Sequence, residues 1–146
     1  MKQTMCELPK LDRKRTQSAV EAALEKYRIF KMMMFEQREA VIIASYQERF
    51  HGSTNQTSDQ TAYVAIHNVD ALAQRRAYCE WIEQSVKRLH PREQLLIEER
   101  YMKNDYIYDY HIYTSVFDPP ISEGTYYKLR WNAFYKLALL LNLDVS

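Results

Sequence analysis

A run of polar, basic and aromatic residues near the C-terminal end of the chain has the composition of a surface that contacts nucleic acid. Hydroxyl, lysine and arginine side chains donate hydrogen bonds to phosphate oxygens and to acceptors on base edges. A glycine in such a run lets the backbone approach a ligand closely. The candidate contact residues are Ser122, Glu123, Gly124, Thr125, Tyr127, Lys128, Arg130 and Trp131.

The spacing of the apolar residues in the same run places these side chains on a helix. Ser122 is a suitable N-cap, because its hydroxyl can accept a hydrogen bond from a backbone N–H of the first turn. A stripe with spacings of three and four follows, made of Tyr126, Leu129, Ala133, Leu137 and Leu140. With that stripe buried, Thr125, Tyr127 and Lys128 remain for base contacts. Arg130 lies at the edge of the stripe, where we expect it to bind a phosphate.

A short helix and a break precede this helix. Asp109 is a candidate N-cap for a helix over Tyr110–Val116. The sequence Phe117-Asp118-Pro119-Pro120 ends it, because helical geometry is disfavoured before a proline. This order is typical of a helix-turn-helix, whose second helix, here about Ser122–Leu141, enters the DNA major groove. Residues Asn104–Glu123 contain acidic residues and no lysine or arginine, so we expect modest affinity for DNA from one domain.

The rest of the chain divides around a polar stretch. Residues 51–61, HGSTNQTSDQT, are rich in Ser, Thr, Asn and Gln and contain no apolar residue, which is typical of a linker. We therefore assign residues 1–50 to an N-terminal helical segment, residues 51–68 to a polar linker and residues 69–146 to a C-terminal helix-turn-helix domain. We expect the linker to be mobile or irregular.

Helical spacing predicts the remaining elements. One helix begins near Asp12 and covers residues up to Phe35, after which the pattern either continues or breaks and resumes. A second covers Val69–Leu89, with Cys79 as a buried member of its stripe. A third runs from Pro91 to about Met102, since proline suits the first turn of a helix. The basic cluster Arg13-Lys14-Arg15 could touch DNA, but we assign it to a solvated helix start.

The composition predicts an all-α protein. The 146 residues include only 2 glycines and 4 prolines, too few for a sheet protein with many tight turns. No apolar span is long enough for a membrane helix, and the polar N-terminus has no secretory signal, so we expect a cytoplasmic protein without membrane contact. The net charge of +1 argues neither for nor against nucleic acid.

Catalytic and metal-binding patterns are not evident in the sequence. The 4 histidines show no paired spacing with each other or with Cys6 and Cys79, and zinc usually requires such pairs. No nucleophile lies beside a candidate base in a known motif. We therefore expect no enzymatic activity, no metal and no cofactor, and two reduced thiols. Most of the tyrosines should pack in the core, with Tyr127 as the exception.

The C-terminal run also resembles a known family. Residues Ile121–Ala138 look like the C-terminal part of the ArpU-type (autolysin regulatory protein) family of phage and prophage transcription regulators. Similar segments occur upstream at Leu8–Asp12, Asn68–Asp70 and Leu95–Tyr101. The C-terminal half is also similar to the promoter-binding region 4 of bacterial sigma factors. The resemblance implies control of late phage genes through promoter DNA, with host RNA polymerase as a further partner.

We therefore predict a transcription regulator that binds duplex DNA in a sequence-specific manner. Two alternatives remain open: a phage DNA-packaging or recombination accessory protein, and a helical protein-interaction module that does not bind DNA. We expect a homodimer, since helix-turn-helix proteins commonly bind two half-sites. The dimer contact would come from the N-terminal helices with their cluster Met32–Phe35.

Overall fold

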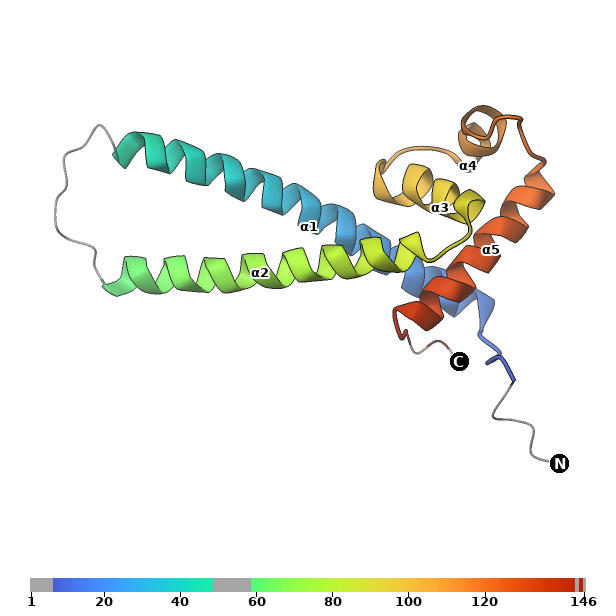
Figure 1. Ribbon diagram of the computed structural model, residues 1–146, viewed down its shortest axis with the longest axis horizontal. Helices are drawn as coiled ribbons and strands as arrows, with labels where there is room; N and C mark the ends of the chain where they lie inside the picture. Colours follow the sequence, from blue (N-terminus) through green and yellow to red (C-terminus); the bar gives the residue numbers. More distant parts are fainter. Residues whose placement is uncertain (1–6, 49–58, 144, 146) are drawn as a thin grey trace. The chain divides into compact units, whose positions relative to one another are not determined.

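The structure is a computed structural model that describes residues 7–48, 59–143 and 145, with side chains for all of these except 36–42, 44–48 and 59–68. Most of the described residues are helical and none forms a strand, which confirms the all-α prediction. The elements are α1 (Arg13–Glu48), α2 (Asp59–Lys87), α3 (Pro91–Ile97), η2 (Glu98–Met102), α4 (Asp109–His111), η3 (Ile112–Val116) and α5 (Glu123–Leu140) (Figure 1). The η elements are π-helical turns that extend α3 and α4.

The chain forms two compact units, and segments from both halves of the sequence build the first one. The first unit combines the chain up to Glu25 with the chain from Ile82 onward, and the second comprises Lys26–Trp81. Hydrogen bonds join the distant segments within the first unit. The backbone N–H of Asp12 donates to the carbonyl oxygen of Val145 at 3.1 Å. The predicted division at residues 1–50, 51–68 and 69–146 therefore differs from the units observed.

Part of the predicted linker is helical. Helix α2 begins at Asp59, so the residues that we assigned to the linker from Asp59 to Asn68 belong to it. The prediction relied on the polar residues 51–61, whereas Ala62 and Ala65 follow directly and favour a helix. Residues 49–58 lie outside the described part of the chain.

Helix α1 is capped as its sequence indicates. The side chain of Asp12 accepts a hydrogen bond from the backbone N–H of Arg15 at 2.8 Å. Val20 and Leu24 are fully buried in the first unit. The helix continues without a break to Glu48, so of the two alternatives for its second half the continuous helix is the one observed.

The second unit contains an aromatic cluster between α1 and α2. The rings of Phe30 and Tyr78 meet edge-on at 5.3 Å, and the ammonium group of Lys26 lies 4.7 Å from the centre of the Tyr78 ring. Cys79 is 2% exposed and its thiol donates weakly to the carbonyl oxygen of Tyr27 at 3.9 Å. This confirms the prediction that Cys79 is a buried member of the α2 stripe.

The core of the first unit surrounds α5. Helix α3 packs against α5 and contributes Leu96 and Ile97, both fully buried. The α5 residues with at most 1% exposure are Tyr126, Ala133, Phe134, Leu137 and Ala138. The predicted members Leu129 and Leu140 are only half-buried, because the buried face of α5 also includes Phe134 and Ala138. The face is therefore wider than the single stripe that we predicted.

A buried ion pair joins α3 to α5. The carboxylate of Glu93 is 3% exposed and accepts hydrogen bonds from Lys136 Nζ at 2.8 and 3.2 Å. It also accepts from the backbone N–H of His90 at 3.0 Å, while His90 Nδ1 accepts from the N–H of Arg92 at 3.2 Å. This reciprocal capping box, with Pro91 in the first turn, explains why α3 starts here.

The short helix before α5 starts differently from our prediction. The residue that precedes α4 is Tyr108, which makes no side-chain cap, and Asp109 is the first residue of the helix. Asp109 was therefore wrongly assigned as the N-cap. Its carboxylate instead forms ion pairs with Arg100 and Arg130, as described below. The helix ends where predicted, before Phe117, whose ring is buried in the core at 4% exposure.

Candidate nucleic-acid interface

The first turn of α5 has the cap that its sequence predicts. The hydroxyl of Ser122 accepts from the backbone N–H of Thr125 at 3.2 Å and donates to the Thr125 hydroxyl at 2.9 Å. Glu123, Gly124 and Thr125 are all exposed. The turn is therefore fixed in conformation and open to a ligand.

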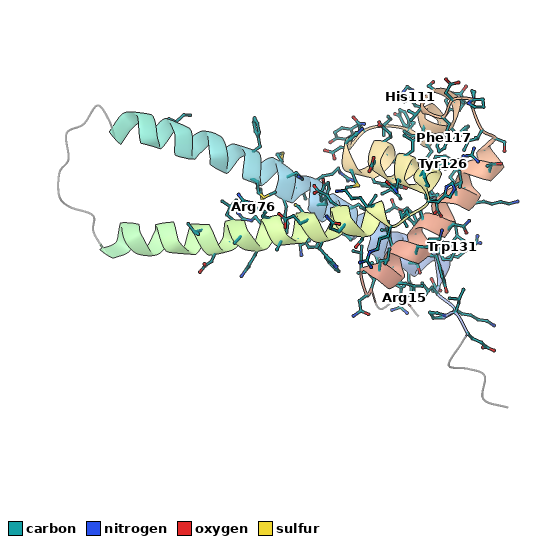
Figure 2. All side chains as sticks on the ribbon, viewed as in Figure 1. Arg15, Arg76, His111, Phe117, Tyr126 and Trp131 are labelled. Carbon is teal, nitrogen blue, oxygen red and sulfur yellow. The ribbon has the colours of Figure 1, made fainter. Side chains whose placement is uncertain are left out.

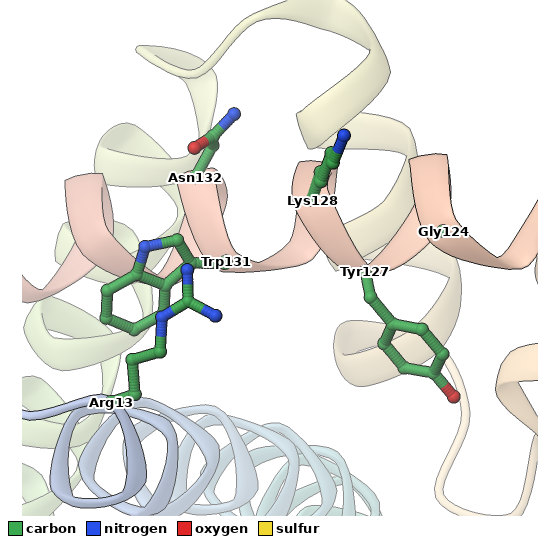
Figure 3. A pocket seen from close by; sticks show the side chains of 6 residues that line it. All are labelled: Arg13, Gly124, Tyr127, Lys128, Trp131 and Asn132. Carbon is green, nitrogen blue, oxygen red and sulfur yellow. The ribbon is translucent and has the colours of Figure 1, made fainter.

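An open hollow lies between this part of α5 and the start of α1. Its volume is about 310 Å³, and its lining residues are Arg13, Gly124, Tyr127, Lys128, Trp131 and Asn132. The guanidinium carbon of Arg13 lies 4.8 Å from the centre of the Trp131 ring, a cation–π arrangement. Figure 3 shows Lys128 and Asn132 extending from one side of α5 and Tyr127 from the other. Four of the predicted contact residues, Gly124, Tyr127, Lys128 and Trp131, thus line the same hollow.

Arg13 is the site residue whose position the sequence did not indicate. We had assigned the cluster Arg13-Lys14-Arg15 to a solvated helix start. These residues are exposed, but Arg13 also covers Trp131 of α5. The basic composition of the cluster was a signal, but the sequence alone could not show that α1 starts beside α5.

Arg130 is turned away from this hollow. Its side chain is 18% exposed and its Nη1 atom lies 3.5 Å from a carboxylate oxygen of Asp109. Its guanidinium carbon lies 4.7 Å from the ring centre of Tyr127 and 5.6 Å from that of Phe134. The phosphate contact that we predicted for Arg130 stays a prediction, and the structure gives this residue partners within the protein.

Asp109 connects α4 to η2 and α5. Its carboxylate accepts from Arg100 Nε of η2 at 3.0 Å and from the hydroxyl of Tyr126 in α5. With the contact to Arg130, these hydrogen bonds join α4 to η2, which precedes it, and to α5, which follows it. Burial raises the pKa of Tyr126, and its hydrogen bond to Asp109 raises it further, so the tyrosine stays neutral and donates.

Four tyrosine rings contact one another in series from Tyr110 in α4 to Tyr127 on the surface of α5. Ring centres are 5.5 Å apart for Tyr110 and Tyr113, 5.3 Å for Tyr113 and Tyr126, and 5.3 Å for Tyr126 and Tyr127. Figure 2 shows Tyr126 within the first unit, with Trp131 further along α5. Burial raises the pKa of Tyr101 to about 12, and its ring packs on Phe134. Packing therefore accounts for several of the tyrosines, as predicted.

Three tyrosines depart from the prediction that most of them pack in the core. The exposed fractions are 97% for Tyr106, 82% for Tyr108 and 66% for Tyr110. Tyr106 and Tyr108 lie between η2 and α4, and Tyr110 lies in α4. No feature of the sequence that we used separates them from the buried tyrosines nearby.

Other kinds of site are not found in the described part of the chain. No group of three or more His, Cys, Asp and Glu side chains there could hold a metal ion. Among the same residues, no helix is both long and apolar enough to cross a membrane.

The chain is similar to a phage-related protein. A protein of Listeria innocua, described as an uncharacterized phage-related protein, is 27% identical to the chain over 147 residues, which cover 96% of each of the two chains. This similarity associates the chain with phage genes, in agreement with the sequence analysis. No known family model matches the chain. No solved structure matches it either.

Proposed function

We propose that the protein is a transcription regulator of phage or prophage genes that binds duplex DNA in a sequence-specific manner. In this proposal α5 is the recognition helix, and α4 with η3 forms the first helix of a helix-turn-helix. The observation that carries the proposal is the hollow beside α5, where a capped and exposed helix start lies next to a cation from α1.

The charge of this surface supports DNA as its ligand. Arg13 and Lys128 line the hollow and are exposed. Lys10, Lys14 and Arg15 are also exposed and lie close to Arg13 in the sequence. Lysine and arginine side chains that neutralise phosphates release counterions, which is the main source of affinity for DNA. The acidic stretch before α5 limits this attraction. In the proposal, the basic residues near the start of α1 supply the positive charge that the helix-turn-helix itself lacks.

We also propose roles for individual residues of this surface. Lys128 suits the acceptors of guanine and Asn132 suits the paired donor and acceptor of adenine, and both extend from the same side of α5. Gly124 has no side chain, so a backbone or base edge of the DNA can approach it closely. Arg13 binds a phosphate, while Arg130 acts indirectly by holding Tyr127 and Asp109 in place.

The test starts with selection of bound sequences from random duplex DNA, followed by fluorescence anisotropy on the selected duplex at several salt concentrations. We expect Lys128→Ala to lose preference at one base pair, at about 1–3 kcal/mol. Arg13→Ala should weaken binding to all sequences and reduce the salt slope by about one contact.

A matched control is Lys103→Ala, which removes an exposed lysine that pairs with Glu99 at 2.8 Å, away from the hollow. Its affinity for the selected duplex should equal that of the wild type. Two outcomes contradict the proposal: a selection that enriches no sequence, and unchanged binding by both Lys128→Ala and Arg13→Ala at every salt concentration.

Regulation of late genes, with host RNA polymerase as a partner, is supported by the resemblance to the ArpU-type family and to sigma region 4. The similarity to a phage-related protein is compatible with it. Transcription in vitro from a promoter that carries the selected sequence, with and without the protein, tests this part. An unchanged transcript level would limit the function to DNA binding.

We also propose that the protein binds DNA as a dimer. Met32 and Phe35 are 57% and 66% exposed on α1, and Ile29 is 43% exposed. A second copy would cover these apolar side chains and double the number of phosphate contacts. Light scattering at high micromolar concentration should report twice the monomer mass, and Phe35→Glu should reduce it to the monomer mass. A wild-type monomer, both with and without DNA, would refute the dimer.

A further inference from the structure

The segment Asp105–Tyr110, here called the tyrosine segment, exposes three large rings that the DNA-binding proposal does not use. Tyr106 and Tyr108 are 97% and 82% exposed, which is unusual for large aromatic side chains. The segment lies in the first unit and comprises most of the connection from η2 to α4 together with the first two residues of α4. It therefore belongs to the same unit as the α5 surface but is made of different residues.

The backbone of the tyrosine segment is anchored although its rings are exposed. The carbonyl oxygen of Tyr108 accepts from the N–H groups of His111 at 3.1 Å and Ile112 at 3.4 Å. Tyr108 is extended, with φ −84° and ψ 146°, and Ile107 before it is half-buried. Tyr106 lies in a bend two residues before Tyr108, and both rings are exposed. A partner would meet rings whose backbone is already ordered, which lowers the entropy lost on binding.

The charges around the tyrosine segment repel a nucleic acid. The chain from Asn104 to Glu123 contains no lysine or arginine. Arg100 and Arg130 approach the segment, but their side chains are only 22% and 18% exposed and both are bound by Asp109. Lys103, which directly precedes this stretch, is paired with Glu99 at 2.8 Å, and the stretch itself exposes the carboxylate of Asp118. Such a surface attracts a positively charged partner.

The chemistry of the rings indicates which cations would bind. Tyrosine faces bind guanidinium and ammonium groups, and tyrosine is enriched in protein interfaces because one end is apolar and the other polar. The first unit already contains this contact internally: Arg100 lies 4.6 Å from the ring centre of Tyr101, and Arg130 lies 4.7 Å from that of Tyr127. An arginine-bearing partner could repeat it on the exposed rings.

We infer that the tyrosine segment is a docking surface for a protein partner that presents arginine or lysine next to apolar side chains. Tyr106 and Tyr108 take the basic and apolar side chains, and the nearby carboxylates attract the partner. The inference does not depend on the proposed DNA binding, because the two surfaces share no residue. It would give a DNA-bound molecule a free face for a second macromolecule.

The experiment uses the intact protein as the target and selects binding peptides from a displayed library of random dodecapeptides. The enriched peptides are then titrated against the protein. We expect enriched peptides to carry arginine or lysine and a net positive charge. They should bind the double variant Tyr106→Ala/Tyr108→Ala at least about tenfold more weakly than the wild type, as expected for the loss of aromatic anchors. Both residues are exposed, so circular dichroism of the variant should match the wild type.

Two controls make the outcome specific. Phe35→Ala removes a ring that is 66% exposed from the second unit and should bind the peptides normally. Lys128→Ala should also bind them normally, so a failure of DNA binding is distinguished from a failure of docking. The inference is overturned if the enriched peptides are neutral or acidic, if the double variant binds them like the wild type, or if the double variant loses duplex DNA instead.

Discussion

Gly124 lies in the first turn of α5. Its substitution by alanine should affect the stability of the fold and the proposed DNA binding in opposite directions. The glycine is exposed, and a Cβ atom built there would meet no other atom within 4 Å, so alanine fits the free protein. Alanine is favoured over glycine in a helix interior by about 0.5–1 kcal/mol, and the smaller value is expected near a helix end. Gly124→Ala should therefore raise the free energy of unfolding by about 0.5 kcal/mol.

The same methyl group should weaken the complex with DNA. Gly124 lines the hollow together with Lys128 and Asn132, so close approach of DNA would bring its atoms against the new Cβ. Forcing a methyl group into a packed contact costs about 1–3 kcal/mol, which corresponds to roughly five- to 150-fold in Kd. Urea unfolding measures the first effect, and fluorescence anisotropy with the selected duplex measures the second.

The opposite substitution elsewhere in the first unit is the control. Ala22→Gly changes an exposed position of α1, so it should lower the free energy of unfolding by about 0.5–1 kcal/mol and leave Kd unchanged. If Gly124→Ala stabilises the protein and binds DNA as tightly as the wild type, no close approach occurs at Gly124. In that case the roles assigned to the first turn of α5 would be wrong.

Further predictions concern the polar contacts of the first unit. Tyr126→Phe removes the hydrogen bond to Asp109 and should lower the free energy of unfolding by about 1.5–3 kcal/mol in urea titrations; an unchanged midpoint would mean that this bond contributes nothing net. Because burial raises the pKa of Tyr101 from 10.0 to about 12, its contribution to stability is complete below pH 10.0 and is lost as the pH rises from there toward 12. Urea midpoints should fall over that range, and less so in Tyr101→Phe. Lys136→Met removes the half-exposed cation from the buried carboxylate of Glu93, which keeps the N–H of His90, and should lower the free energy of unfolding by about 1–3 kcal/mol; the double variant with Glu93→Gln should recover part of this loss.

Local signals in the sequence predicted the elements and several of the site residues. The Ser122 cap depends only on a hydroxyl beside the first turn of a helix, and the structure has it. Pro91 indicated the start of α3 for a similarly local reason. The exposure of Lys128 followed from its position off the apolar stripe. Each of these features is decided within about one helical turn, so a single sequence is enough to identify it.

Features that depend on neighbours far along the chain were not predicted. The contact of Arg13 with Trp131 requires α1 to start beside α5, which no local pattern encodes. Asp109 had the residue type of an N-cap, but its carboxylate accepts from Arg100 and Tyr126, which belong to other elements that no local pattern brings beside it. Periodicity also underestimated the buried face of α5, since Phe134 packs against Tyr101 from another element.

The hydrogen bonds that join the two halves of the sequence have a consequence for synthesis. The hydroxyl of Tyr135 donates to the carbonyl oxygen of Pro9 at 2.6 Å, and the N–H of Asp12 donates to Val145. A chain emerges from the ribosome with its earlier residues first, so Pro9 and Asp12 cannot make these hydrogen bonds until α5 and Val145 have been synthesised. An incomplete translation product that lacks α5 has neither Trp131 nor Lys128, so it cannot compete with finished molecules for the proposed DNA site.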